Sequence, residues 1–163
     1  GHGQGFQGRA RVKAYVGTGR WQFFRNVLVF DTSALPDSAI ITAARLTIVM
    51  ISKRNNFTSS VSVVASTPAS DTTLVANDYD QFGTTDLATP RTIASLGATG
   101  AEVFTLNAAG RAAISTTANT RLGIRISDDI NDIEPTWSVS DSSEIRYEDE
   151  TATPPSLEID YTY

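Results

Sequence analysis

The sequence contains no cysteine, which excludes disulfide bonds, thiolate zinc sites and a thiol nucleophile. Its single histidine, His2, lies in a glycine-rich start, so a catalytic triad or a histidine metal site lacks its base or its ligand. No apolar run approaches the roughly 18 residues of a membrane-spanning helix, and we expect no membrane span. Stability therefore has to come from packing, and any chemistry from carboxylate, amide, guanidinium and aromatic groups.

Lysine is scarce as well: Lys13 and Lys53 stand against eleven arginines, and the formal net charge is -5. Nucleic-acid binding is driven largely by Lys and Arg that replace phosphate counterions, so we expect no nucleic-acid partner. Many Ser and Thr with few Lys favour a secreted, extracellular protein or one on a virion surface. The 18 acidic residues lie mostly in polar segments and not in the apolar settings that raise a carboxyl pKa. Glycosidase or lyase chemistry is therefore not favoured, and we expect a protein that is not an enzyme.

The length of 163 residues suits a single domain. We assign residues 1–7 to a flexible N-terminal segment or tag remnant, and residues 8–163 to one domain. Within this domain, apolar and polar residues alternate with the period of two that is typical of half-buried strands. The alternating segments are 9–16, 45–50, 60–65, 121–126 and 156–163.

Residues 27–30 break this alternation because they are apolar on both faces. The pattern is that of a central strand covered on both sides or of a strand beneath a loop, and we expect it in the middle of a sheet. Helix is predicted only in short turns, after an N-cap at Asn107 and within residues 74–83. Short strands separated by Gly, Pro, Asn and Asp predict an all-β fold, a jelly-roll-like antiparallel β-sandwich with one or two short helical turns.

Residues 25–50, RNVLVFDTSALPDSAIITAARLTIVM, carry a distinctive order. An Arg leads a strand that ends in Phe-Asp, a Ser-x-Leu-Pro turn follows, and Ala-x-Ile-x-x-Ala-x-Leu opens the next strand. This order resembles the DNRLRE-type domain, a β-sandwich related to disaggregatase modules and to one group of carbohydrate-binding modules. A short helix, TRLGIRISDD, SEIRYED and PPSLEIDYTY then follow in a similar order, so the resemblance covers most of the chain.

The resemblance implies an appendage of a polysaccharide-degrading enzyme, of a cell-surface protein or of a phage-like structural protein. The sequence departs from the family at one place, because the usual N-terminal strand with its D-x-x-I start is missing or altered. An incomplete sheet edge invites a donated strand. The turn at Leu35-Pro36-Asp37 is expected to be a central hairpin or a corner where the chain crosses between sheets.

Sugar binding needs exposed aromatic rings beside polar groups, because apolar sugar faces stack on rings while hydroxyls take hydrogen bonds. Trp21 is the better candidate, since Arg20 and Arg25 lie near it in GTGRWQFFR. Trp137 lies in a polar loop, and Tyr79 is a further candidate. For each ring the alternative is packing into the core of the sandwich.

A basic row, Arg9, Arg11 and Lys13, alternates with small apolar residues. Such a row could grip an anionic polymer such as a uronate polysaccharide, through bidentate pairs of Arg with carboxylates. The alternative is that the charges guard an edge strand against pairing with a neighbouring molecule.

An acidic loop, SDDINDIE, gathers oxygen ligands of the kind that Ca²⁺ prefers. Its spacing does not match an EF-hand, so the hypothesis is a structural calcium site at the rim of the sandwich, and the alternative is an ordinary acidic loop. The candidate ligands are Asp128, Asp129, Asn131 and Asp132.

Two functions from different classes follow. In the preferred one, the chain is a non-catalytic extracellular accessory module that binds a polysaccharide, possibly an anionic one, through loop aromatics and Arg side chains. In the other, it is a structural or adhesive subunit of an extracellular or phage-virion assembly, which binds copies of itself or a neighbouring protein.

Overall fold

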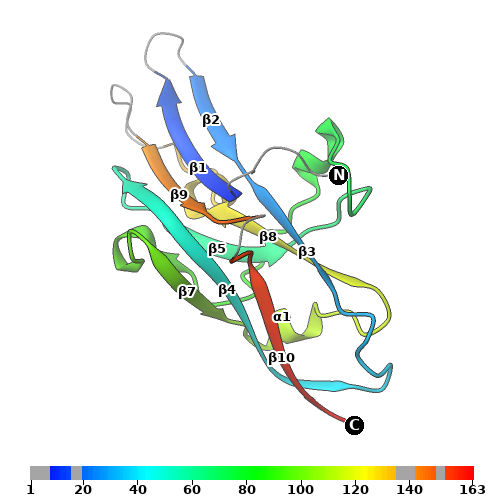
Figure 1. Ribbon diagram of the computed structural model, residues 1–163. Coiled ribbons are helices and arrows are strands. Elements are labelled where there is room, and N and C mark those ends of the chain that lie inside the picture. The colour runs from blue at the N-terminus through cyan, green and yellow to red at the C-terminus, as the bar shows by residue number, and fades with distance from the viewer. Residues whose placement is uncertain (1–7, 16–19, 135–141, 150–152) are drawn as a thin grey trace.

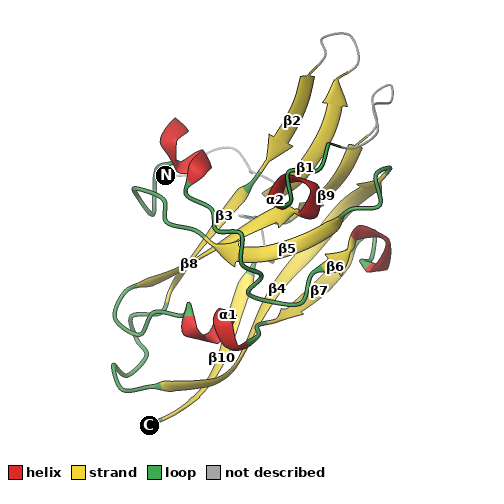
Figure 2. Ribbon diagram, turned by 180° about the vertical axis from the view of Figure 1, so that it is seen from behind, coloured by secondary structure: helices red, strands yellow, loops and turns green. Residues whose placement is uncertain are grey.

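The structure, a computed structural model, describes residues 8–15, 20–134, 142–149 and 153–163, with side chains from Trp21 onward. Two antiparallel sheets lie face to face, and short helices lie only in the connections between strands (Figures 1 and 2). The predicted all-β sandwich with short helical turns is confirmed. Among the described residues, no helix is both long and apolar enough to cross a membrane.

The larger sheet is built around one long strand, β4. Its strands are β1 (Gly8–Tyr15), β2 (Arg20–Phe24), β4 (Ile40–Asn55), β7 (Gly100–Thr105), β9 (Ser142–Tyr147) and β10 (Ser156–Thr162). Leu46 pairs with both Phe104 of β7 and Leu157 of β10, whereas Met50 pairs with both Gly100 of β7 and Tyr147 of β9. A residue has one neighbour on each side, so β7 lies on one side of β4, and β9 and β10 follow one another along the other side. Next to β9 comes β1, and next to β1 comes β2.

The smaller sheet has the order β3 (Asn26–Asp31), β8 (Asn119–Ile126), β5 (Ser60–Ala65) and β6 (Arg91–Thr92). Alternate residues of both sheets point into one shared core, as the period of two predicts. The fully buried core side chains include Leu46, Ile48, Phe104, Leu122, Ile124 and Ile145.

The expectation that residues 27–30 form the middle of a sheet is wrong, because among the described strands β3 pairs with β8 alone and lies at an edge. In this sheet, the strands buried on both faces are β8 and β5. The apolar second face of β3 has another cause: Val27 lies beside Leu74 and Phe82 of the connection that covers this sheet. A strand covered by a loop and a central strand share the same apolar pattern, so the pattern could not separate them.

The turn at Leu35-Pro36-Asp37 is a corner, because β3 belongs to the smaller sheet and β4 to the larger one. Asp31 begins it by accepting hydrogen bonds from the backbone N–H and the hydroxyl of Ser33, at 3.1 and 2.6 Å. The backbone N–H of Leu35 donates to the carbonyl of Thr32 at 3.1 Å. These local bonds turn the chain from one layer to the next.

The predicted helical turns are confirmed. Asn107 caps α1 (Ala108–Ala112), because its side-chain oxygen accepts the N–H of Gly110 at 2.9 Å. The other short helical segments are η1 (Ala76–Asp80), η2 (Ile93–Ser95) and α2 (Ser127–Ile130).

The edge-strand explanation of the basic row is wrong, because β1 pairs with β9 on one side and with β2 on the other. Arg11 and Lys13 therefore have a strand on each side, whereas Arg9, in the same strand, pairs among the described residues only with Arg146 of β9. Their side chains lie outside the described part of the structure, so binding of an anionic polymer by this row stays a prediction.

Candidate functional site

A groove of about 530 Å³ opens where β2 leaves the larger sheet and the loop after β8 begins. Three segments that are far apart in the sequence supply its walls. Its described lining residues are Trp21, Phe23, Arg25, Tyr79, Asp128, Asp129, Asp132, Ile133 and Glu134. Three of the predicted ligand-binding residues and three of the predicted metal ligands thus border one groove.

Arg25 is the single residue between β2 and β3, at the point where the chain passes from one sheet to the other. Its guanidinium donates two parallel hydrogen bonds to Asp129, Nε to Oδ2 and Nη2 to Oδ1, each 2.8 Å long. Nη1 donates to the backbone carbonyl of Tyr79. The guanidinium carbon also lies 3.9 Å from the centroid of the Tyr79 ring. Arg25 therefore holds the ring of Tyr79, which is 41% exposed, in a fixed place on the wall.

Asp129 lies between two arginines. Arg125, from β8, donates from Nε to Oδ2 of Asp129 at 2.8 Å and from Nη2 to its backbone carbonyl at 3.0 Å. The side chains of Asp129 and Arg125 are only 6% and 5% exposed. Burial by itself would raise the pKa of Asp129, but the hydrogen bonds from Arg25 and Arg125 hold it below its ordinary value. Asp129 is thus an ionised, fully bonded carboxylate at the floor of the groove.

Trp21 is half-buried, and its side chain contacts Glu134 and Phe57. Its indole N–H donates to Oε1 of Glu134 at 2.9 Å. Its ring meets Phe57 edge to face, with the ring centroids 6.2 Å apart. The indole thereby connects the acidic loop to the sheet. It lines one side of the groove, whereas the sequence predicts an exposed ring on which a sugar could stack.

The remaining predicted binding residues fall elsewhere. Trp137 lies outside the described residues, as does the side chain of Arg20 at the start of β2. Asn131 does not line the groove. It ends α2, where its backbone N–H donates to the carbonyl of Ser127 at 2.9 Å.

The geometry gives the calcium hypothesis little support. Both oxygens of Asp129 are bound by guanidinium groups. Over the described ranges, no three Asp, Glu, His or Cys side chains come together as a metal-binding group. Calcium binding by this loop stays a prediction, and it is checked by the melting temperature in Ca²⁺ against that in a chelator; a bound structural ion would raise it.

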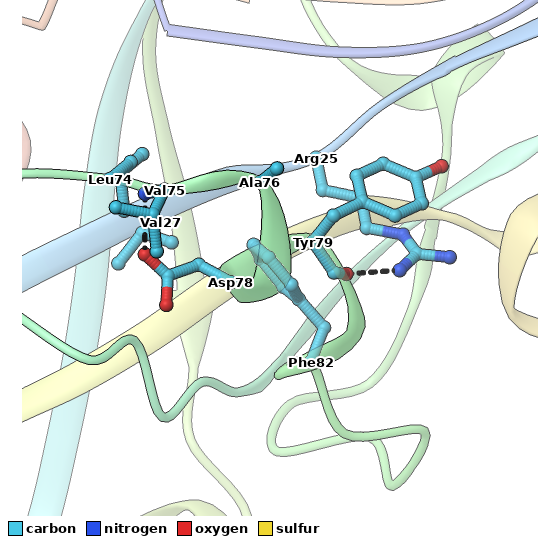
Figure 3. A pocket seen from close by; sticks show the side chains of 8 residues that line it. All are labelled: Arg25, Val27, Leu74, Val75, Ala76, Asp78, Tyr79 and Phe82. Carbon is cyan, nitrogen blue, oxygen red and sulfur yellow. Dashed lines mark hydrogen bonds between the residues drawn. The ribbon is translucent and has the colours of Figure 1, made fainter.

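A second, apolar pocket of about 260 Å³ shares Arg25 and Tyr79 with the groove. Figure 3 shows Val27, Leu74 and Val75 on one side of it and the ring of Tyr79 on the other. Leu74 and Val75 are 62% and 52% exposed. Sequence reasoning missed this pocket, although two adjacent apolar residues before a polar turn are a visible signal.

The connection that carries Tyr79 is held by its own carboxylate. Asp78 accepts the backbone N–H groups of Ala69 and Val75, both at 2.8 Å, and the bond to Val75 is drawn in Figure 3. These hydrogen bonds lower the pKa of Asp78. The aromatic wall of the groove is therefore anchored from both sides, by Asp78 through the backbone and by Arg25 through the ring.

Comparison of the chain with protein-family models, with curated proteins and with solved structures found no match. The resemblance to the DNRLRE-type domain accordingly stays a prediction from the sequence.

Proposed function

We propose that the chain is a non-catalytic extracellular module that binds a polysaccharide in the groove at Trp21, Arg25 and Tyr79. The observation that carries this proposal is the exposed ring of Tyr79, stacked on Arg25 beside a row of carboxylates in one groove of about 530 Å³. A ring held in place binds the apolar face of a sugar without losing its own freedom, while carboxylates accept hydrogen bonds from sugar hydroxyls.

The charge of the groove favours a neutral glycan. Arg25 and Asp129 bind each other, which leaves Asp128, Asp132 and Glu134 as the further charged groups on the described walls. A uronate chain would bring more negative charge to this surface and would be repelled. Binding of an anionic polysaccharide would have to rest on Arg9, Arg11 and Lys13 of β1 instead.

The absence of catalysis is part of the proposal. A glycosidase uses a carboxylic acid whose pKa is raised so that it can donate a proton. Asp129, the carboxylate at the floor of the groove, has a lowered pKa and two arginine partners, which suits a structural role.

The test is retention of the protein on immobilised neutral polysaccharides, a β-glucan, a mannan and a xylan, beside polygalacturonate. We expect retention on a neutral polymer and at least about a fivefold loss of affinity in Tyr79→Ala, since aromatic stacking is worth about 1 kcal/mol beyond burial. Tyr161→Ala is the matched control, because Tyr161 is similarly exposed at 39% but lies in β10. Equal binding by both variants, or retention only on polygalacturonate, would contradict the proposal.

The second candidate, a structural or adhesive subunit, is favoured by a different observation, the open edge of β10. Light scattering after size exclusion separates the two candidates. A monomer that binds a glycan supports the module, whereas a stable oligomer that binds none of the polysaccharides supports the subunit.

A further inference from the structure

The strand β10 has one open edge. It pairs with β4 over its whole length, and no strand of the described residues pairs with its other side. Half of the N–H and C=O groups of such a strand point outward and require another partner, water or a further strand. Figure 1 shows β10, in red, beside the lower part of β4.

The register shows where an added strand would run. β9 and β10 follow one another along the same side of β4, with Tyr147 opposite Met50 and Ser156 opposite Thr47. β1 pairs with the outer side of β9 and begins with Gly8 opposite Tyr147. The space beside β10 therefore continues the line of β1. A strand in this space would pair with β10 as β1 pairs with β9.

The two faces of β10 differ in chemistry. Leu157 and Ile159 point inward, are half-buried and pack against the core. Glu158 and Asp160 point outward, with side chains 70% and 52% exposed, and the single guanidinium of Arg45 bridges both at 3.0 and 3.2 Å. An added strand would therefore place apolar residues beside Leu157 and Ile159, and would meet an excess of negative charge on the outer face.

The usual protections of an edge strand are weak here. β10 contains neither Lys nor Pro. The register shift at Asp160 places the extra residue, Thr42, in β4, so β10 itself runs without a bulge. Two copies pairing through β10 would bring acidic outer faces together, which is unfavourable. The open edge therefore favours a strand whose outward side chains are not acidic.

We propose that the open edge of β10 binds an extended segment of another polypeptide, in which apolar residues alternate with Lys or Arg. The backbone of that segment pairs with β10, its apolar residues cover Leu157 and Ile159, and its basic residues lie beside Glu158 and Asp160. This surface is separate from the groove, since none of the residues lining the groove belongs to β10.

The test uses three capped heptapeptides and the isotope-labelled protein of residues 1–163. The first alternates Lys with Val, the second alternates Glu with Val, and the third is the Lys–Val peptide with alternate amides N-methylated so that one edge cannot pair. We expect the first peptide to shift the amide NMR signals of β10, and the second and third to bind at least tenfold more weakly. In the variant Glu158→Lys with Asp160→Lys, the preference between the first two peptides reverses.

Other results would overturn the proposal. Equal binding of the N-methylated peptide would mean that charge alone attracts the peptide. Signal shifts confined to the groove would place the binding there. Slow hydrogen exchange of the outward amides of β10 in the protein alone would show that the edge is already paired within the chain. Tyr79→Ala keeps peptide binding unchanged, which separates this test from that of the polysaccharide.

Discussion

Arg25 connects three parts of the molecule from one position between two strands. Its planar guanidinium binds Asp129 with two hydrogen bonds and also stacks on Tyr79. A lysine could not replace it, because an ammonium group is not planar and cannot stack on a ring, and it does not offer two parallel N–H donors to a carboxylate. The groove, the start of β3 and the loop after β8 therefore depend on the same side chain.

The substitution Asp129→Ala is expected to lower the free energy of unfolding by about 3–5 kcal/mol, because it leaves the largely buried guanidinium groups of Arg25 and Arg125 without their carboxylate. Urea denaturation measures this loss. Glu158→Ala is the control, since its ion pair with Arg45 is exposed and such pairs contribute about 0–1 kcal/mol. Similar small losses in the two variants would contradict the structural role of Asp129.

Acid should destabilise the protein in a defined window. The folded pKa of Asp129 lies below its ordinary value, despite burial, because of its two arginines. A carboxyl of this kind contributes its stabilisation above the unfolded pKa of about 3.9, and the contribution is lost as the pH falls through that value and then through the folded pKa. Urea titrations between pH 6 and about 2 should therefore show falling stability, with a shallower slope in Asp129→Asn; identical slopes would refute the assignment.

At the scale of elements, the outer face of β8 explains how the connections are held. Arg121 binds Asp71, and Arg125 binds Asp129 in α2. Between them, a Cβ on Gly123 would lie 2.5 Å from Cδ1 of Phe82, so only glycine lets this ring approach the sheet. The outward positions 121, 123 and 125 of β8 thus each contact a segment that covers the strand, at Asp71, Phe82 and Asp129 respectively. This is why both faces of β8 are buried.

The helix α1 gives a prediction in which two effects oppose each other. Ala at position 110 would improve helix propensity by about 1 kcal/mol, but its Cβ would lie 2.2 Å from the carbonyl oxygen of Leu87. That carbonyl accepts the N–H of Asn107 at 2.8 Å and cannot move without breaking the bond. Gly110→Ala should therefore lower the melting temperature, with a net loss of about 1–3 kcal/mol.

The matched control for Gly110→Ala is Ala109→Gly in the same helix. Ala109 is exposed, so only helix propensity changes, and we expect a loss of up to about 1 kcal/mol. A higher melting temperature for Gly110→Ala than for the parent protein would show that α1 does not pack against Leu87 in this way.

At the scale of the whole molecule, the two sheets share one core, and several short stretches of chain cross between them. β2 runs into β3 through Arg25 alone, and β3 runs into β4 through the corner at Leu35-Pro36-Asp37. Separation of the two sheets would expose side chains such as Leu46 and Leu122, which are fully buried. The sandwich should therefore behave as one cooperative unit.

This predicts a single unfolding transition. The urea midpoints from near-ultraviolet circular dichroism, which reports side-chain packing, and from far-ultraviolet circular dichroism, which reports strands, are expected to coincide. Two separated midpoints would show that one sheet unfolds while the other persists. The same midpoints in the presence of the bound polysaccharide should rise together.

Part of the candidate site could be foreseen from the sequence. Aromatic and guanidinium groups suit sugar binding, which predicts Trp21, Tyr79 and Arg25 as binding residues, and all three line the groove. Their roles could not be foreseen. The acidic loop predicts Asp129 as a metal ligand, whereas in the structure its carboxylate binds Arg25, 104 positions away in the chain. A carboxylate in a sequence carries no sign of which distant cation will meet it.

The sequence by itself determined the alternating strands, the helical turns after Asn107 and within residues 74–83, and the all-β class, because alternation, N-caps and turn residues act over a few neighbouring positions. Only the tertiary structure decided that β3 lies at an edge, that β1 is interior and that the turn at Leu35-Pro36-Asp37 is a corner. It also decided the groove and the open edge of β10. These depend on which strands pair across long separations, and pairing follows from the best burial of the whole core, a property that no short segment carries.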